Sequence, residues 1–273
     1  MDALGNRMKM YESIGQIQLM PLLPVVARLD GKAFHNFTKG LHRPFDDNFI
    51  KLMVNTTKYL VEETNALIGY TQSDEITLIW YSDNIKSQIF MGGRHFKMIA
   101  ILSAMTTAFF QKKLKYFLPD KSEQNPLFDC RVWNVPNKTE AINTLIWREQ
   151  DAVRNSISML AQSKFSHNEL YKKTTDDMQE MLFQKHQINW NDLPNDKKRG
   201  TYIRRKKIIS PFTCEEIEKL PLKHDARKNP SLVVERNIIE ILDMPILTKI
   251  LNREEVIFNG DEPLIYDGYV DPS

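Results

Sequence analysis

The stretches VVARLDG (residues 25–31) and GYTQSDEITLIW (69–80) decide the fold of this 273-residue chain. The first is a compact apolar run that ends on an acidic residue and a glycine, a pattern that suits a strand buried on both faces. In the second, two strand-like runs, 67–71 and 76–81, flank the four residues Gln72 to Glu75. This arrangement predicts a β-hairpin with a tight turn.

Helical periodicity fills the gaps between these strands. Asp46 can cap a helix that continues to about residue 63, and an apolar segment over 94–118 predicts a second long helix. A further strand is expected over 128–135. The resulting order, β-α-β-β-α-β, is that of ferredoxin-like and polymerase-palm folds, in which an antiparallel sheet carries two helices on one face. We therefore expect an α+β fold with a palm catalytic core over residues 1–136.

Beyond Pro136 the sequence becomes mostly helical. The expected elements are helices over 138–162 and 167–186, a basic segment over 197–207, and one or two short helices over 238–252 that break at Pro245. The change in character is not linker-like, because no stretch rich in Gly, Ser or Pro separates the two parts. Residues 137–273 are therefore expected to form an appended, helical and basic region that packs directly on the palm.

Composition sets the broad class of protein. Hydrophobic residues make up 42% and charged residues 26%, as in globular proteins with a buried core, and the net charge of +2 is too small to indicate nucleic-acid binding by itself. Cys130 and Cys214 lack the spacing of a zinc site or a disulfide framework. There is no apolar stretch of membrane-spanning length and no secretory signal pattern. We expect a cytoplasmic protein without membrane association.

The acidic residues of the two deciding stretches are expected to meet. In a palm, the end of the first strand and the hairpin turn lie on neighbouring strands, which brings Asp30 close to Asp74. Two carboxylates at close range repel unless positive charge lies between them, and Mg²⁺ takes such oxygen ligands together with substrate phosphates. The carbonyl of Gly31 can add a ligand because glycine lets the backbone approach closely. The pattern indicates a two-Mg²⁺ site of the kind that serves phosphoryl transfer.

Each motif alone has a simpler interpretation. Asp-Gly is often only a turn, and Ser-Asp-Glu is often only a polar hairpin loop; it is their combination on adjacent strand ends that indicates a metal site. Phe34 and His35 follow the first motif, where they could contact a base or a triphosphate. Trp147, by contrast, is expected to be a packing residue.

Several stretches together resemble the signature of the tRNA-His guanylyltransferase family. They are VVARLDGKAFHNF (25–37), Arg43-Pro44, GYTQSDE (69–75), FDCRV (128–132), Trp147-Arg148 and KRGT (198–201). The resemblance extends over residues 8–207. It implies a reverse polymerase, an enzyme with a polymerase-like palm that adds nucleotides to the 5′ end of RNA in the 3′-5′ direction.

In the reaction that this resemblance implies, ATP first activates the 5′-monophosphate of the RNA as an adenylylated end. The 3′-hydroxyl of an incoming GTP or other nucleoside triphosphate then attacks that end, and AMP leaves. Both steps are phosphoryl transfers, in which positioning and charge neutralisation provide most of the catalysis. The implied partners are tRNA or tRNA-like RNA and nucleoside triphosphates, and members of the family are commonly homotetramers.

The resemblance also assigns roles to individual residues. Asp30, the Gly31 carbonyl and Asp74 match the ligands of the two Mg²⁺ ions, and Glu75 matches a family acid that we expect to support the catalytic site rather than bind metal. Arg43 replaces the family's usual lysine, and its planar guanidinium would bind a triphosphate in a different geometry. The nucleotide-binding loop and its partner across the site match Lys32, Ala33, Phe34, His35 and Ser73.

The segment after Trp147-Arg148 departs from the family pattern. tRNA-His guanylyltransferases carry a His-Ile-Asn-Asn-Leu-Tyr-Asn type motif there, linked to their preference for histidine tRNA. This chain has DAVRNSIS (151–158) and keeps only Asn155, a candidate nucleotide-binding residue, of the first polar set. The departure resembles the Thg1-like protein branch, which repairs truncated 5′ ends of various tRNAs by templated addition. We expect 5′-end repair, with tRNA-His guanylyltransferase activity as the alternative.

Two further functions are compatible with paired acids on a palm. A nucleotide cyclase of the diguanylate type would have a Gly-Gly-Asp/Glu-Glu-Phe turn, where this chain has Gln-Ser-Asp-Glu-Ile (72–76). A non-catalytic RNA-binding protein with a relic palm would bind RNA independently of Asp30 and Asp74. The run 197–207 has seven basic residues in eleven, which fits either phosphate binding through counterion release or a solvated surface.

Overall fold

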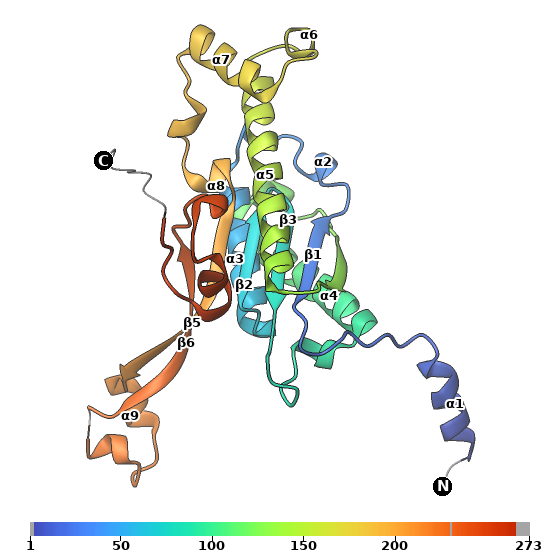
Figure 1. The fold of residues 1–273 in the computed structure, drawn as a ribbon, viewed down its shortest axis with the longest axis vertical. Helices are drawn as coiled ribbons and strands as arrows, with labels where there is room; N and C mark the ends of the chain where they lie inside the picture. The colour runs from blue at the N-terminus through green and yellow to red at the C-terminus, as the bar shows by residue number, and fades with distance from the viewer. Residues whose placement is uncertain (1–2, 230, 266–273) are drawn as a thin grey trace, which may run out of the picture.

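The computed structural model describes residues 3–229 and 231–265, and within them the chain forms a six-stranded antiparallel sheet in the order β4-β1-β3-β2-β5-β6 (Figure 1). The strands are β1 (Val25–Gly31), β2 (Ile68–Gln72), β3 (Glu75–Trp80), β4 (Phe128–Asn134), β5 (Thr201–Pro211) and β6 (Val233–Leu242). The first four have the strand order of a ferredoxin-like or palm core, so the predicted core fold is confirmed.

Two long helices cover one face of the sheet. α3 (Asp47–Thr64) begins after Asp46, whose carboxylate accepts hydrogen bonds from two main-chain amides at 2.9 and 3.0 Å, as expected of a helix cap. α4 (His95–Phe117) follows the 3-10 turn η1 (Phe90–Gly93). Between these helices and the sheet lies the main hydrophobic core, whose fully buried side chains include Val25, Ala27, Leu29, Leu52, Leu60, Ile76, Leu78 and Leu102.

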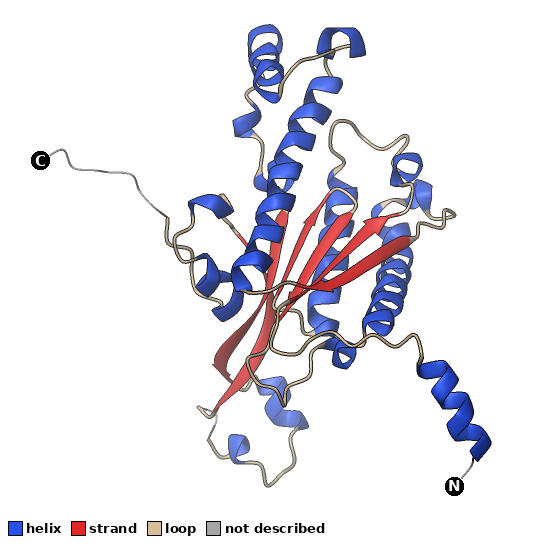
Figure 2. Cartoon of the chain, turned by 45° about the vertical axis from the view of Figure 1, so that its right-hand side comes forward, coloured by secondary structure: helices blue, strands red, loops and turns tan. Residues whose placement is uncertain are grey.

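The opposite face of the sheet is covered only in part. α5 (Lys138–Gln162), the helix predicted over those residues, crosses this face (Figure 2) and packs on Val26, Tyr70 and Ile79. On the edge strand β4, Asp129 and Arg131 are exposed. The part of this face formed by β1 and β4 is therefore open beside α5.

The region after Pro136 contributes strands as well as helices. β5 pairs with β2, and β6 pairs with β5 along its whole length. The expectation of short helices over 238–252 is wrong, because residues up to Leu242 belong to β6 and only the 3-10 turn η5 (Leu247–Lys249) follows. Ile238, Ile239 and Ile241 are β-branched, and such residues favour strands over helices. The appended region is accordingly less helical than predicted.

The helix expected over 167–186 is divided into α6 (His167–Leu170) and α7 (Thr175–His186). Lys172 has a φ of 58°, which no helix accommodates, and Thr174 starts α7 with a capping box. The remaining short elements are α1 (Ala3–Ser13), α2 (Phe34–Phe37), α8 (Asn195–Lys198), α9 (Cys214–Lys219), η2 (Pro119–Lys121), η3 (Trp190–Asp192), η4 (Asp225–Arg227) and η6 (Glu255–Asn259).

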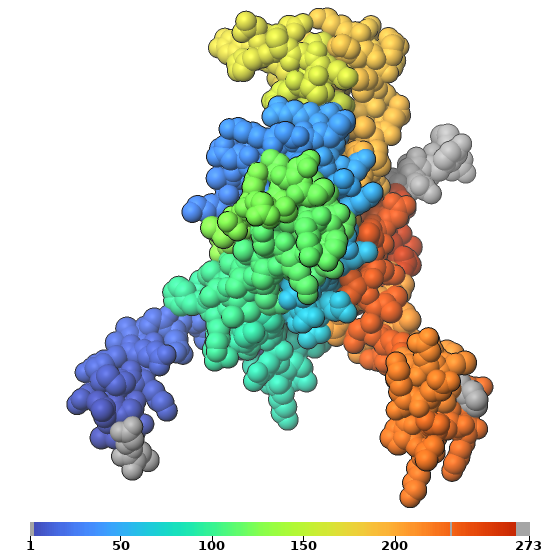
Figure 3. All heavy atoms as spheres, turned by 180° about the vertical axis from the view of Figure 1, so that it is seen from behind, coloured from blue at the N-terminus to red at the C-terminus, as the bar shows by residue number. Residues whose placement is uncertain are grey.

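Three parts project from the body of the molecule: α1, the lobe of α6 and α7, and the outer end of the β5–β6 ribbon with α9 (Figure 3). The lobe has a small core of its own, around Leu160, Phe165 and Leu182. None of the residues of α1 is buried. Among the residues that the structure describes, no helix combines the length and the apolar character that crossing a membrane requires.

Candidate active site

The turn between β2 and β3 is only two residues long, Ser73 and Asp74. Ser73 has a φ of 50°, in the left-handed region that is unfavourable for a residue with a side chain. The Ser73 hydroxyl donates a hydrogen bond to Oδ1 of Asp74 at 3.0 Å, so the strained residue also orients the carboxylate. The hairpin predicted around residues 72–75 is confirmed.

β1 places Asp30 beside this turn. In the antiparallel register, Asp30 is the partner of Glu75 on β3 and of Asp129 on β4. Residues paired across neighbouring strands project to the same face of a sheet, so three carboxylates form a row on the face that carries α5. Asp129 was not expected at the site, because its position opposite Asp30 follows from the sheet register and not from any motif.

Burial, with a further effect of the neighbouring carboxylates, raises the pKa values of Asp30 and Asp74. The pKa of Asp74 is raised to about 6, mainly by burial and also by the negative charges of Asp30 and Glu75. Burial, and next the charge of Asp129, raise the pKa of Asp30 above its ordinary value. A nearby divalent cation stabilises the charged form of such carboxylates, because it offsets the repulsion between them.

The donor set suits Mg²⁺. Across residues 3–229 and 231–265 no group of three or more His, Cys, Asp or Glu side chains is arranged to hold a metal ion by itself. Mg²⁺ does not need such a cage, since it binds through one or two carboxylates and completes its shell with water and substrate phosphates. Asp30, Asp74 and the Gly31 carbonyl therefore fit the magnesium ligands that were expected, and their role stays a prediction.

The loop after β1 divides into a buried and an exposed part. A Cβ atom on Gly31 would lie 2.3 Å from the ring of Phe34, so this glycine is required for packing as well. Phe34 is 3% exposed, and its ring packs in the core at a tilt against the rings of Phe37 and Phe128, each at a centroid distance of 4.9 Å. The expected contact of this ring with a base or triphosphate is therefore wrong, and only the main chain of Phe34 can face a phosphate. The exposed residues of the loop are Lys32, Ala33 and His35.

Two arginines hold Glu75. Arg148 of α5 is 5% exposed; it forms an ion pair with Glu75 and donates a hydrogen bond to Asp151 at 2.8 Å. Nε of Arg28 on β1 lies 3.5 Å from Oε1 of Glu75. The Arg148 and Arg28 guanidiniums lie 4.5 and 5.3 Å from the ring centroid of Trp147. These contacts agree with the supporting role expected of Glu75, and they include residues for which sequence analysis had no role.

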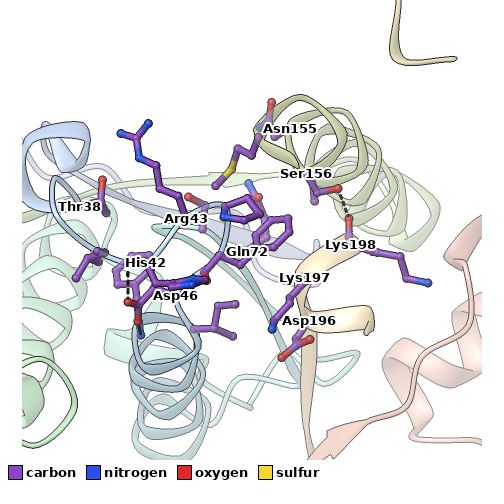
Figure 4. Close-up of a pocket in the computed structure, with 18 of the residues that line it drawn as sticks. Thr38, His42, Arg43, Asp46, Gln72, Asn155, Ser156, Asp196, Lys197 and Lys198 are labelled. Atoms are coloured by element: carbon purple, nitrogen blue, oxygen red, sulfur yellow. Dashed lines mark hydrogen bonds between the residues drawn. The ribbon is translucent and has the colours of Figure 1, made fainter. Parts of the chain in front are cut away.

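A cavity of about 280 Å³ opens next to the turn, between the loop 38–46 and the carboxyl-terminal half of α5 (Figure 4). It brings together Arg43, Ser73 and Asn155, which sequence analysis assigned to nucleotide binding from three separate segments. The cavity is also lined by residues that had not been assigned, among them Gln72, Ser156, Lys197 and Lys198. Because Ser73 precedes Asp74 in the turn, the cavity lies beside the acidic row.

The basic run 197–207 is largely neutralised within the protein. Its side chains make ion pairs from Lys197 to Asp47, from Arg204 and Lys206 to Glu240 and Glu262, and from Lys207 to Glu235. Arg199 and Arg205 donate to the side chains of Asn195 and Asn65, and Lys198 to the main chain of Asn191. Ion pairing favours a structural role for most of this run over phosphate binding.

A palm sheet with Asp30 and Asp74 on adjacent strand ends, beside a cavity lined by cationic and polar groups, defines a palm-fold nucleotidyltransferase. Comparison with known proteins specifies the group. Residues 5–136 match the family model described as tRNAHis guanylyltransferase. The tRNA(His) guanylyltransferase of Schizosaccharomyces pombe is 31% identical over 215 residues, which cover 73% of this chain and 79% of the relative. The chain belongs to the tRNA(His) guanylyltransferase family.

Solved structures agree with this assignment. A bacterial tRNA(His) guanylyltransferase (Thg1)-like protein in complex with ATP superposes with a TM-score of 0.75 and 32% identity, over 94% of this chain and 100% of that one. The complex of such a bacterial protein with GTP gives a TM-score of 0.68 and 31% identity, over 91% and 95% of the two chains. The resemblance seen in the sequence motifs is thereby confirmed, and with it the class of enzyme.

Proposed function

We propose that the protein extends the 5′ end of tRNA or tRNA-like RNA in the 3′-5′ direction, as a 5′-end repair enzyme. The observation that carries this proposal is the cavity that joins Arg43, Ser73 and Asn155 next to Asp74. A volume of about 280 Å³ is at the low end for a ligand pocket and suits a base with its ribose, so the triphosphate would extend toward Asp30 and Asp74. The related structures with ATP and GTP support nucleoside triphosphates as substrates.

Two phosphoryl transfers make up the proposed reaction. In the first, an oxygen of the RNA 5′-monophosphate attacks the α-phosphorus of ATP, pyrophosphate leaves, and the RNA end is adenylylated. In the second, the 3′-hydroxyl of the incoming nucleoside triphosphate attacks the 5′-phosphorus of the RNA, its proton passes to solvent, and AMP leaves. Each step exchanges one phosphoanhydride or phosphate ester bond for another, so no oxidant or reductant is needed.

The side chains have distinct tasks in this scheme. Arg43 would bind triphosphate oxygens where the triphosphate leaves the cavity, and its fixed fork of N–H donors suits two oxygens at once. Asp30, Asp74 and the Gly31 carbonyl would hold Mg²⁺, which neutralises the charge that develops on the phosphoryl oxygens. Arg148 would hold the Glu75 carboxylate in place through their ion pair.

The segment 151–158 supports repair over histidine-specific guanylylation. Asp151 is engaged by Arg148 and by Arg154, the latter at 2.9 Å, and Asn155 is the one residue of the family's first polar set that reaches the cavity. The alternative has support of its own, because the curated relative from S. pombe is named tRNA(His) guanylyltransferase.

One assay separates these functions. A 5′-truncated, 5′-monophosphorylated tRNA is incubated with ATP, Mg²⁺ and labelled nucleoside triphosphates; we expect growth at the 5′ end that follows the template strand. Addition to full-length histidine tRNA alone would identify the alternative, and a cyclic dinucleotide made from GTP alone would identify a cyclase. We expect Asp30→Ala and Asp74→Ala to abolish both steps while circular dichroism stays unchanged. Near-normal rates in either variant would contradict the metal assignment.

We also propose that the enzyme is a homotetramer. The complete lack of buried residues in α1 supports this, because a projecting helix is more stable when another surface covers it. Light scattering should give about four times the chain mass of 32.0 kDa, and a monomeric mass would contradict the proposal.

A further inference from the structure

Trp147 on α5 is 48% exposed, although tryptophan is highly buried in most proteins and a packing residue was expected at this position. We propose that Trp147 stacks on the terminal nucleobase of the RNA whose 5′ end reacts beside Asp30 and Asp74. This inference rests on the proposed function, and it adds a binding surface for the RNA to the site that holds the nucleotide.

The position of Trp147 is fixed relative to the acids. The guanidinium of Arg28, two residues before Asp30 on β1, lies 5.3 Å from the Trp147 ring centroid. Residues two apart on a strand project to the same face and are separated by roughly 7 Å. Trp147 therefore borders the open part of the sheet face, close to Asp30.

The nucleotide cavity and Trp147 lie at different heights along α5. The residues with which the helix lines the cavity include Ala152, Asn155, Ser156 and Met159. Since a helix rises 1.5 Å per residue, these positions are about 8 to 18 Å further along the axis than Trp147. Between them, Arg148 reaches across to Glu75 in the acidic row. A nucleotide in the cavity and a second reactant against Trp147 would thus approach the acids from two sides.

Chemistry indicates that this second reactant is the RNA end. Exposed aromatic rings bind unpaired bases by stacking, and arginines beside them add cation–π and phosphate contacts. Arg154, seven residues after Trp147 and so on the same side of α5, has a side chain that is 54% exposed and held by Asp151 at 2.9 Å. In the activation step only ATP and RNA are present. The proposed function places the base of ATP in the cavity. The base available to Trp147 in that step therefore belongs to the RNA.

Single-turnover adenylylation of a 5′-monophosphorylated tRNA by Mg²⁺-ATP tests the proposal. Base–aromatic stacking contributes enough that Trp147→Ala should raise the RNA concentration for half-maximal rate by roughly 5- to 150-fold. Trp147→Phe, which keeps a smaller ring, should raise it less than Trp147→Leu. The half-saturating ATP concentration should change by less than about twofold in all three variants, because ATP binds elsewhere. Phe183→Ala is the matched control, since Phe183 is 49% exposed on α7 and should change neither value.

Each other outcome has a definite meaning. An unchanged half-saturating RNA concentration in folded Trp147→Ala, with an active wild-type enzyme, would overturn the inference and leave the proposed function standing. A lower maximal rate at unchanged RNA affinity would also overturn it, since the ring would then act only by holding Arg28 and Arg148. An effect confined to the incoming nucleotide in the second step would do the same. If the wild-type enzyme does not adenylylate RNA at all, the proposed function itself fails. Should Trp147→Ala not fold, the comparison of Trp147→Phe with Trp147→Leu decides.

Discussion

Replacing Asp74 with asparagine should make the metal-free protein more stable at about pH 8 while it abolishes catalysis. The pKa of Asp74 in the folded protein is raised from 3.8 to about 6, so the folded state binds this proton more tightly than the unfolded state does. Stability is therefore lost as the pH rises from about 4 through about 6. At 1.36 kcal/mol for each pKa unit, the loss is roughly 3 kcal/mol. Asparagine stays neutral, so the variant does not lose this stability as the pH rises.

Chemical denaturation in EDTA, at about pH 4 and pH 8, measures the effect. We expect the free energy of unfolding of Asp74→Asn to exceed that of the wild type by up to about 3 kcal/mol at pH 8, or about 5 °C in Tm for a chain of this size. At pH 4 the difference should be much smaller. Saturating Mg²⁺ should stabilise the wild type by mass action and Asp74→Asn far less. Asp83→Asn, at an exposed carboxylate beyond the other end of β3, should change stability by less than about 0.5 kcal/mol. Equal or lower stability of Asp74→Asn at pH 8, or equal stabilisation by Mg²⁺, would refute the reasoning.

Three further predictions concern the contacts around the site. Arg148→Ala should lower the free energy of unfolding in urea by about 3 kcal/mol, because it leaves Glu75 and Asp151 without their buried partner, and Arg148→Lys should lower it less; an unchanged midpoint would contradict this. Gly200→Ala should lower the free energy of unfolding by at least about 2 kcal/mol more than Gly40→Ala does. Both glycines have a positive φ, 81° and 86°, but a Cβ on Gly200 would lie 2.6 Å from the Thr71 carbonyl oxygen, whereas the space at Gly40 is open. Equal losses in the two variants would show that the close contact has no effect. Lys207→Ala should change the half-saturating RNA concentration by less than about twofold, because Lys207 is paired with Glu235 at 2.7 Å; a larger loss that depends on salt would restore the phosphate-binding role of the basic run.

The palm core could be predicted because its local patterns and its topology agree. The apolar run before Asp30, the cap at Asp46 and the hairpin around Ser73 each specify one element, and only a palm-like sheet combines them in that order. β5 and β6 could not be predicted in the same way. Residues 204–207 of β5 are all basic, which hides the alternation of a strand, and the acids that neutralise them, such as Glu240 and Glu262, come from distant positions.

The proximity of Asp30 and Asp74, whose role as metal ligands stays a prediction, followed from the sequence for the same reason as the core: Asp30 lies near the end of β1, and Asp74 lies in the turn that leads into the neighbouring strand β3. The arginine cluster did not, because Arg28, Glu75 and Arg148 meet only when α5 lies across the sheet. The adjacent Trp147-Arg148 pair in the motif was the one available signal. The inward packing of the Phe34 ring against Gly31 could not be predicted, because a loop sequence does not reveal the direction of a side chain.

The two-residue turn at Ser73 and Asp74 restricts the routes by which this enzyme can diversify. Most surface loops accept insertions at small cost in closure entropy. One residue added in the turn that shifted the pairing of β3 by one, however, would reverse every side chain of that strand, turning Thr77 toward α3 and α4 and moving Ile76 and Leu78 to the face that carries α5. New specificities at this corner must therefore arise by exchanging side chains at constant length. Added residues are better tolerated in longer loops, such as the connection between α6 and α7.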